Sequence, residues 1–593
     1  MQSKFHIHIE KHESVLCKLN ARFSIVGYVK LVLVLSIALV AYFLFSRAFL
    51  LELVILSAVL LTSIVSLWIY HANLNKKITY LKGIIAICKQ HIARTTGEWP
   101  AFKDTGHEFV DPDHPYSGDL DIVGNKSLFQ FLNTTHTWHG RQAFANDLLR
   151  PAYEDHQISK RQEAIAELSR DIDFSSKMQY HLSKVGVDSS TPKLVAHLKD
   201  KTAFVNNKPL KLALTYVPSI IFLFIAGIFV FQLRHMYLAA ALFIITQTVV
   251  WAVGMVRANN YLGPVANLPY KLSAYNEVIA ILANRDFACD KLKDIQVNLK
   301  EAATAIKSLG KIANKANVKH NPLIYFALNA LLLWDYYCAI SLQEWMKQYA
   351  HMAEKWFIAI GEFESLLSFS HLPNVCDNTC LPVITGSKKT IEANELGHPL
   401  LPNEKRVNNE FTLKDNILVV SGSNMSGKTT FLRTVGINIV LARAGSFVCA
   451  KTMHNFPLHV ATSMRLADDL NQGVSTFYAE LKRIKSVITM AKQQPNLIFL
   501  IDEIFKGTNS ADRLTGAKAV IEKLNTLGTA GLISTHDLEL CKLAGTHDRI
   551  KNFSFSEHYT DNKICFDYKL KQGKSNTTNA QYLMKMVGIF ESN

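Results

Sequence analysis

The chain has 593 residues, with 64 Lys and Arg against 49 Asp and Glu, so its formal net charge is +15. This length is too great for one hydrophobic core, so we expect several domains, and the basic excess suits nucleic acid or anionic lipid headgroups as partners. The 9 cysteines are scattered without a regular framework, which excludes a disulfide-stabilised secreted scaffold. Cys376 and Cys380, with His371 nearby, lack a fourth ligand at a useful spacing, so no zinc site is expected.

The first 256 residues of the chain contain long apolar runs. Residues 1–25 are polar and mixed in charge, unlike a cleaved signal peptide, so the apolar residues behind them should remain in the protein. Residues 26–45 and 49–70 are each long enough to cross a bilayer of about 30 Å as a helix, and a second pair follows at 212–233 and 235–256. The alternative is four buried helices of a soluble core, but such helices are rarely apolar on every face for this length. We therefore predict two transmembrane hairpins, 26–70 and 212–256.

The distribution of basic residues predicts the orientation of these hairpins. The short links within the hairpins hold only Arg47 and Arg234 as basic residues, and the other ends of the spans carry many more. The positive-inside rule then places the N-terminus and both large segments in the cytoplasm of a multi-pass protein of the cell inner membrane. Lys30 and Glu52, near span ends, are the ionisable residues within the spans, which argues against an ion pathway. The basic flanks are Lys18, Arg22, Lys76, Lys77, Lys82, Lys208, Lys211 and Arg257.

The sequence SGSNMSGKTTFLRTVG, residues 421–436, has the spacing of a phosphate-binding loop, Gly-x-x-x-x-Gly-Lys-Thr. Asn416–Gly422 is an apolar, β-branched run typical of a strand, and helical spacing follows as far as Gly445. In this context, glycine amides and the helix N-terminus surround phosphates, the lysine reaches the β and γ phosphates, and the first threonine offers its hydroxyl to Mg²⁺. The expected nucleotide-binding residues are Gly422, Gly427, Lys428, Thr429 and Thr430, and Thr429 is also an expected Mg²⁺ ligand.

Two further apolar strands are predicted, each ending in residues suited to nucleotide hydrolysis. NLIFLIDE, residues 496–503, ends in adjacent carboxylates, of which Asp502 is placed to hold Mg²⁺ and Glu503 to orient and deprotonate the attacking water. GLISTHD, residues 531–537, presents His536, which can hydrogen-bond the γ phosphate or the water. The alternatives are solvated acids at a strand edge and a packing histidine, but the intact loop favours the catalytic interpretation. ATP and Mg²⁺ are therefore the expected cofactors.

These motifs together resemble one family, the ATPase domain of the MutS DNA mismatch-repair proteins, a branch of the ABC ATPase superfamily. The resemblance rests on GSNMSGKTTFLRTVGINIVLARAGSFVCA, ADDLNQGVSTFYAELKRI, LIDEIFKGTNSADRLTGAKAVIEKL and STHDLELCKLA, and covers nearly all of residues 395–590. It implies that Asn424 and Met425 also bind nucleotide and that two composite sites form in a homodimer. In that dimer, Ser475 and Thr476 are implied to reach the partner subunit's nucleotide from a helix N-terminus. The loop implied to link the two sites holds Asn509, Ser510 and Asp512.

The sequence departs from the family pattern at three positions near the loop. Ser423 and Ser426 stand where proline and glycine are usual, and both departures are conservative. The family often has an aromatic residue near position 406 to stack on adenine, whereas this chain has Arg406. The resemblance therefore does not identify the stacking residue.

The middle of the chain resembles the MutS core or lever domain. NKSLFQFLNTTHTWHGRQAFANDLLRPAY followed by ISKRQEAIAELSRD matches the start of that domain, and long helical patterns continue to about Phe369. The second hairpin interrupts this region, unlike soluble relatives. The residues that carry the match include Gly140, Arg141, Pro151, Arg161 and Gln162.

The predicted fold is an α/β P-loop ATPase domain of the ABC/MutS type, a mainly α-helical MutS core or lever domain, and two transmembrane helical hairpins. The expected order is a cytoplasmic segment at 1–25, the hairpin 26–70, a helical linker at 71–119, the core or lever domain at 120–390 interrupted at 212–256, and the ATPase domain with C-terminal dimerisation helices at 391–593.

The resemblance and the membrane spans together lead to a functional expectation. Residues before 120 leave no room for a mismatch-reading domain, and no Phe-x-Glu stands in a suitable N-terminal setting, so ordinary mismatch recognition is not expected. We expect a membrane-tethered, ATP-driven dimeric clamp with DNA as the favoured partner. The alternatives are an ATP-driven membrane transporter and an ATP-dependent signalling or scaffold protein that hardly turns ATP over. The sequence identifies no protein partner.

Overall fold

The computed structural model describes residues 4–45, 50–151, 154–200, 202–231, 233, 235–384, 390–465, 476–505, 510–560 and 563–575. The chain divides into two compact units. We call Met1–Phe102 with Ile172–Tyr180 the hairpin unit, and Lys103–Asp171 with His181–Asn593 the core unit.

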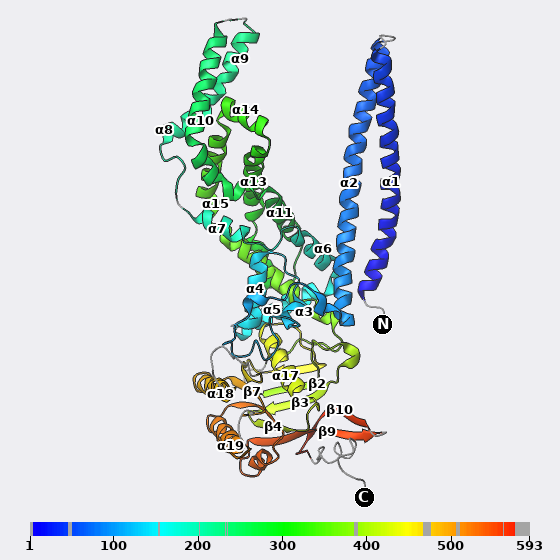
Figure 1. Ribbon diagram of the computed structural model, residues 1–593, viewed down its shortest axis with the longest axis vertical. Helices are drawn as coiled ribbons and strands as arrows, with labels where there is room; N and C mark the ends of the chain where they lie inside the picture. The colour runs from blue at the N-terminus through cyan, green and yellow to red at the C-terminus, as the bar shows by residue number, and fades with distance from the viewer. Residues whose placement is uncertain are drawn as a thin grey trace. The chain divides into compact units, whose positions relative to one another are not determined.

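The hairpin unit contains two long helices, α1 (Lys4–Phe45) and α2 (Leu50–Thr96), and the first part of α6 (Ile172–Ser183). Figure 1 shows α1 and α2 (blue) side by side. Helix α1 is continuous from Lys4, so the polar N-terminal segment and the first expected span form one helix. The start of α6 packs here because Gly83 of α2 leaves no Cβ where the ring of Tyr180 lies.

The link behind the first hairpin is helical over only part of the range expected. Helix α2 ends at Thr96, and Gly97 follows in the left-handed conformation (φ 86°) that glycine adopts without steric cost. Pro100, Pro112 and Pro115 then prevent a regular helix. The structured turns in this stretch are η1 (Trp99–Ala101) and η2 (His107–Phe109).

Four helices are long and apolar enough to cross a membrane by length and composition: Lys4–Val40, Ile55–Thr96, Lys208–Phe229 and Met236–Ala283. They overlap the four apolar runs expected from the sequence. In their most apolar stretches, only 6%, 0%, 17% and 11% of the residues, respectively, are buried within the protein. Large side chains such as Tyr28, Trp68 and Phe229 are exposed, so these helices are not packed as the interior of a soluble core.

The first part of the core unit is helical. Its longest helix, α15 (Trp334–Phe369), packs along α4, α5, α7, α10, α12 and α13, so it forms the axis of this region. Figure 1 shows α9 and α10 side by side, with α14 next to α10. Pro218 lies in η3 (Val217–Ile220), a 3-10 turn between α8 and α9. The other helices are α3 (Leu128–Leu132), α4 (Trp138–Leu149), α5 (Asp155–Arg170), α7 (Ser190–Lys199), α8 (Lys208–Tyr216), α9 (Ile221–Phe229), α10 (Met236–Ala266), α11 (Pro269–Ala283), α12 (Asp290–Asn298), α13 (Ala302–Ala316), η4 (Asn317–His320), α14 (Pro322–Leu332) and α16 (Leu372–Val375).

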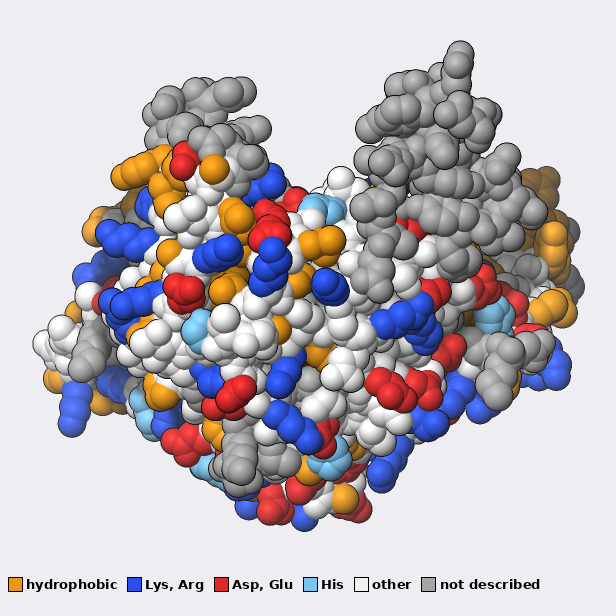
Figure 2. All heavy atoms as spheres, turned by 90° about the horizontal axis from the view of Figure 1, so that it is seen from below, with side chains coloured by type: hydrophobic (Ala, Val, Ile, Leu, Met, Phe, Trp, Pro, Cys, Tyr) orange, Lys and Arg blue, Asp and Glu red, His pale blue; other side chains and the backbone are white. Residues whose placement is uncertain are grey.

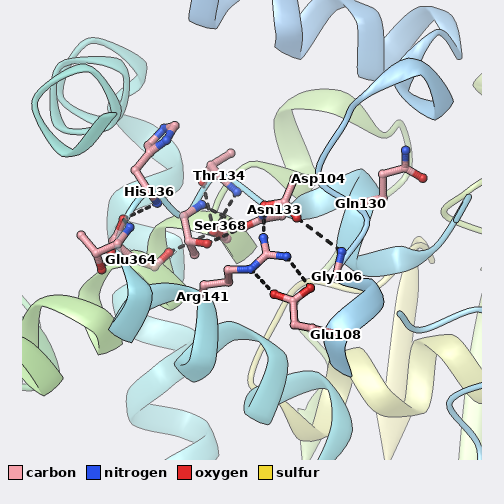
Figure 3. Close-up of polar contacts among 12 residues, drawn as sticks. Asp104, Gly106, Glu108, Gln130, Asn133, Thr134, His136, Arg141, Glu364 and Ser368 are labelled. Carbon is pink, nitrogen blue, oxygen red and sulfur yellow. Dashed lines mark hydrogen bonds and ion pairs between the residues drawn. The ribbon is translucent and has the colours of Figure 1, made fainter. Parts of the chain in front are cut away.

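A polar network joins the C-terminal end of α15 to the start of α4 (Figure 3). Glu364 is buried and accepts hydrogen bonds from the backbone N–H of His136 at 2.7 Å and of Thr137 at 3.2 Å. Burial raises the pKa of Glu364 to about 7, although these hydrogen bonds oppose the shift. Gly140 lies so close to Glu364 that any side chain there would overlap the carboxylate. This contact explains a glycine within the family-like motif.

Arg141, the next residue of that motif, lies in the same network. Its guanidinium pairs with Glu108 at 2.6 Å and with Asp104, and the residues 103–110 are thereby fixed to α4. Asn133 donates to the same Asp104 carboxylate at 2.8 Å, as Figure 3 shows. Because the Asp104 and Glu108 carboxylates both pair with the Arg141 guanidinium, they hold this irregular segment against α4 without the hydrogen bonds of a regular helix or sheet.

The last part of the core unit contains two sheets. The six-stranded sheet has the order β10-β9-β4-β8-β7-β6, in which all neighbours are parallel except β9 and β10. The four-stranded sheet has the order β1-β5-β2-β3. The strands are β1 (Val383–Ile384), β2 (Thr390–Leu396), β3 (Asn409–Lys414), β4 (Ile417–Ser421), β5 (Thr452–Asn455), β6 (His459–Ser463), β7 (Leu497–Asp502), β8 (Ala530–Thr535), β9 (Ile550–Thr560) and β10 (Lys563–Gln572). The helices and turns between them are η5 (Asn403–Lys405), α17 (Lys428–Arg443), α18 (Thr476–Gln493), α19 (Ser510–Thr526) and η6 (Leu540–Gly545).

Helices cover both faces of the six-stranded sheet, which explains why its central strands β4, β7 and β8 are buried at every position. Phe499 and Ile501 of β7 pack with α18 and α19 on one face. Leu500, on the alternate side, lies against Gly436 of α17, where a Cβ would come within 2.8 Å of it. The sheet therefore positions α17 with its N-terminus at the carboxyl end of β4.

Arg161 connects the helical region to α17. Its Nη2 lies 2.6 Å from Asp147 Oδ2, and its Nε donates to the carbonyl oxygen of Ala444, directly after α17, at 2.8 Å. Ser365 of α15 donates to the same Asp147 carboxylate oxygen at 2.5 Å. These buried, charge-assisted contacts join α15, α4 and α5 to the end of α17.

Candidate functional site

The loop between β4 and α17 has the backbone geometry that its glycines require. Gly427 has a φ of 103°, and Met425 also lies in the left-handed region at 67°. Gly427 immediately precedes α17, so the free N–H groups of the helix face the loop. Among the residues that the structure describes, the buried hydroxyl of Ser426 has no hydrogen-bond partner within the protein, which leaves it available to a ligand oxygen.

Lys428, the first residue of α17, is buried beneath the loop. Its ammonium donates to the carbonyl oxygens of Gly422 and Ser423, both at 2.8 Å, and lies 3.3 Å from His536 Nε2. The positive charge is thus held at the centre of the loop. Ser423, one of the departures from the family pattern, donates through its hydroxyl to Glu557 of β9 at 2.7 Å.

Thr429 and Asp502 are brought together by the sheet. The Thr429 hydroxyl donates to Asp502 Oδ2 at 2.8 Å, and Ser534 of β8 donates to the other oxygen of the same carboxylate. The strand register explains this contact. Asp502 of β7 is paired with Ser534 of β8, and Ser421 of β4 is paired with Thr535 of β8. The three strands therefore end at the same edge of the sheet. This edge of a parallel sheet is where ligands bind in open α/β folds.

Glu503 and His536 form a second pair beside the first. His536 Nε2 lies 2.6 Å from Glu503 Oε1, and the Glu503 backbone N–H donates to the carbonyl oxygen of Ser534 at 3.1 Å. Glu503 has a φ of 48°, a conformation that costs a non-glycine residue energy and turns the side chain out of the strand direction. Both residues also line a small cavity of about 40 Å³, a volume on the scale of one water molecule.

A larger cavity of about 620 Å³ opens over the loop. Its lining includes every expected loop residue from Asn424 to Thr430 and also Glu503. It is also lined by Leu396, His398, Lys405, Asn409, Phe555 and Tyr568. Burial and the nearby Arg433 and Arg406 lower the pKa of His398 to about 3, so this imidazole is neutral at physiological pH.

Tyr568 is an aromatic side chain of the cavity lining that the sequence did not indicate. It belongs to β10, and a Cβ added to Gly427 would come within 3.1 Å of its ring. Two features fix this part of β10. The strand register shifts between Phe566 and Leu570. The Asn409 side chain donates to the carbonyl oxygen of Tyr568 at 3.0 Å and accepts from the Leu570 N–H at 2.8 Å. Arg406 instead donates to Leu401 O at 2.8 Å.

Several expected site residues lie outside this constellation. Ser475 and Asn509 are outside the described residues, as is the range 576–593 that includes the expected dimerisation helices. Thr476 and Ser510 begin α18 and α19, but their side chains are not described. Asp512 lies in the first turn of α19 and does not line the large cavity.

Side chains that could together hold a metal ion lie close to one another at one place in the described part of the chain. The one group of three whose ligand atoms lie within 4.8 Å of one another is His8, His12 and Asp173 in the hairpin unit, where His8 and Asp173 form an ion pair at 3.1 Å. Cys376 and Cys380 belong to no such group among the described residues.

Two family profiles match the sequence. The profile described as MutS domain III matches residues 116–370, and the profile described as MutS domain V matches residues 418–592. The first match extends across α8, α9 and α10, so the second pair of apolar helices lies within the domain III region.

Curated relatives carry the same family description. The protein described as DNA mismatch repair protein MutS from Aquifex pyrophilus is 26% identical over 529 residues, 79% of this chain and 59% of that protein. A protein of the same description from Alkaliphilus oremlandii is 30% identical over 39% of this chain and 27% of its own length. Another, from Desulfosudis oleivorans, is 34% identical over 35% of this chain and 24% of its own length. The chain thus spans between about a quarter and three fifths of these relatives. It belongs to the MutS family.

Proposed function

We propose that this chain is a membrane-anchored MutS-type ATPase that binds ATP with Mg²⁺ in the cavity over the β4–α17 loop and hydrolyses it. The observation that carries this proposal is the convergence of Lys428, Thr429, Asp502, Glu503 and His536 at one edge of the sheet. Those residues supply a cation, a hydroxyl–carboxylate pair and a general base, which is the set that phosphoryl transfer to water requires.

Each residue has a role that follows from its position. Lys428 and the α17 N-terminus bind the phosphates, and the Ser426 hydroxyl adds a further donor. Thr429 and Asp502 would hold Mg²⁺, which when bound neutralises phosphate charge. Glu503, beside the water-sized cavity, accepts the proton of the attacking water, and His536 fixes the carboxylate and lies near the γ-phosphate position. Tyr568 stacks on the base, in place of an aromatic residue at position 406.

The proposal includes a homodimer and a membrane anchor. The family resemblance implies composite sites, with Ser475 and Thr476 of one subunit completing the site of the other. The four apolar helices anchor the protein in the cell inner membrane, with the N-terminus, the lever domain and the ATPase domain in the cytoplasm, and their exposed apolar surfaces support the membrane anchor.

DNA is the proposed partner, supported by the names of the relatives and by the net charge of +15. On the face presented in Figure 2, Lys and Arg side chains are interspersed with Asp and Glu side chains and do not form one basic field. This face is therefore a poor candidate for the DNA contact.

The experiment is ATP hydrolysis by the full chain in nanodiscs, with and without duplex or branched DNA, at several salt concentrations. We expect turnover that DNA stimulates and that loses this stimulation as salt rises. Turnover indifferent to every DNA would contradict the DNA assignment, and nucleotide-dependent flux in sealed vesicles would favour the transporter. ATP binding without turnover would favour the scaffold.

A further inference from the structure

Helix α14 (Pro322–Leu332) exposes an apolar face that the expected function does not explain. Leu323 is 84% exposed, Ile324 51% and Phe326 54%. The helix has 11 residues, about 16 Å, which is too short to cross a bilayer. A bend of 79° separates it from α15, so it does not extend α15 into a straight span.

Well-defined contacts fix α14 against α10. Trp251 of α10 lies edge-on to Tyr325 and Phe326, with ring centroids 5.7 Å and 6.0 Å apart. The Trp251 indole donates to Asp335 Oδ2 at 3.0 Å, and the Tyr325 hydroxyl donates to the same oxygen at 2.5 Å. Asp335 is the second residue of α15 and is buried, so three helices meet at one carboxylate. The exposed face of α14 is therefore held in a fixed orientation.

The caps of α14 are also built into the fold. The Asn321 side chain accepts from the backbone N–H of Ile324 at 3.3 Å, which satisfies a free donor at the start of the helix. Leu333 has a φ of 50° and makes the turn into α15, where the Asn329 side chain accepts from the Asp335 N–H at 2.9 Å. The exposed apolar side chains thus belong to a stable helix.

The position of α14 along α10 indicates its depth relative to a bilayer. The apolar stretch of α10 runs from Met236 to Val256, about 30 Å of helix, and Arg257 follows. Trp251 precedes Arg257 by six residues, about 9 Å along the helix. An interfacial helix lies about 5–10 Å below the headgroup boundary, which agrees with this depth.

The residues around α14 have the composition of a membrane interface. Trp251, Tyr325 and Tyr336 surround the junction, and Tyr336 donates to the carbonyl oxygen of Val250 at 3.0 Å. Trp and Tyr are enriched at the boundary between headgroups and acyl chains. Lys319 lies in η4, three residues before α14, where a basic side chain can reach anionic headgroups.

We propose that α14 is an interfacial helix whose Leu323, Ile324 and Phe326 side chains lie among the lipid acyl chains of the cytoplasmic leaflet. This inference rests on the proposed membrane anchoring. Lipid is the occupant we choose because Trp251, which α14 contacts, belongs to the apolar stretch of α10 that elsewhere exposes Val249, Val253 and Val256. The four spans fix the protein in the bilayer, and α14 fixes the start of the 36-residue helix α15 at its surface.

The test introduces one cysteine at a time into the full chain in nanodiscs and labels it with bimane, in a background where Cys17, Cys380 and Cys565, the cysteines that are not buried, are replaced by serine. Leu323→Cys is the test position. Val253→Cys on α10 is the control within a span, and Lys347→Cys, exposed on α15, is the aqueous control. Quenching is measured with lipids that carry a nitroxide on the acyl chain and, separately, with iodide in water.

We expect Leu323→Cys to be quenched by the nitroxide lipid at least about threefold more than Lys347→Cys, and to resist iodide. Lipid quenching at Val253→Cys with iodide quenching at Leu323→Cys would overturn the assignment of α14 and leave the membrane anchor intact. Protection of Leu323→Cys from both quenchers would overturn it in favour of a protein occupant, such as a second copy of the chain. Iodide quenching at all three positions would overturn the membrane anchor itself.

Discussion

The hydroxyl of Thr429 donates to Asp502 Oδ2 at 2.8 Å, which joins the first turn of α17 to the carboxyl end of β7. The two residues are separated by more than seventy positions in the chain, and the parallel pairing of β4, β8 and β7 brings them together. Ser534, which donates to the other Asp502 oxygen, orients the carboxylate. A hydroxyl and an oriented carboxylate are ligands that Mg²⁺ accepts together with phosphate oxygens.

Asp502→Asn should weaken the binding of ATP in the presence of Mg²⁺ by about 10–100-fold, because the amide keeps the shape of the side chain and removes the charge that attracts the cation. Binding of ATP with the metal chelated should change much less. Calorimetric titration of both forms measures the difference. Asp415→Asn, an acid beyond the far end of β4, is the matched control, and equal losses with and without Mg²⁺ would contradict the metal-binding role.

Glu503→Gln should reduce ATP turnover by at least about 100-fold with little change in ATP affinity, because glutamine cannot accept the proton of the attacking water. Steady-state phosphate release and equilibrium nucleotide binding together separate the two effects. Glu522→Gln, exposed on α19, should leave both unchanged. Turnover that survives Glu503→Gln would exclude this residue as the general base and support the scaffold alternative.

The sequence predicted the parts of the site that depend on local spacing. The loop from Gly422 to Thr430 and the acids at the end of β7 lie where strand, loop and helix patterns placed them, because each of these candidate residues ends or follows an apolar strand. Parallel strands end at the same edge of a sheet, so His536 after β8 joined the same group. Those contacts require only the correct strand order.

Other features depend on tertiary structure and were not predicted. Tyr568 reaches the loop through a register shift in β10 and through Asn409, and neither follows from a spacing rule. Helix α14 was missed because its 11 residues are too few for a search based on span length. Its apolar face is identified only when the packing of α10 shows which side chains remain exposed.

Tyr568→Ala should weaken ATP binding by about tenfold or more, since stacking between an aromatic side chain and a base contributes about 1–3 kcal/mol. Tyr568→Phe keeps the ring and should bind ATP almost as the wild type does. Both substitutions retain a side chain at a φ of 51°, so backbone strain is matched between them. Tripolyphosphate, which has no base, should bind the two variants equally. A loss of tripolyphosphate binding in Tyr568→Ala would show that the ring supports the loop and does not stack on the base.

Glu364 should make the stability of the core unit depend on pH. Its pKa is raised by burial from 4.5 to about 7, so the folded protein holds this proton more tightly than the unfolded chain does. The resulting stabilisation is fully present below about pH 4.5 and is lost as pH rises through about 7. The shift corresponds to about 3 kcal/mol of the free energy of unfolding.

Glu364→Gln tests this linkage, because glutamine does not titrate and its amide oxygen can still accept from His136 and Thr137. The free energy of unfolding, measured by urea denaturation monitored by tryptophan fluorescence between pH 4.5 and 8, should fall less steeply with rising pH in the variant. The difference between the two curves should approach about 3 kcal/mol at the high end. Ser370→Ala, at another buried polar side chain just beyond α15, changes no titrating group and should keep the wild-type slope. Parallel curves for wild type and Glu364→Gln would mean that Glu364 is ionised in the folded protein throughout this range.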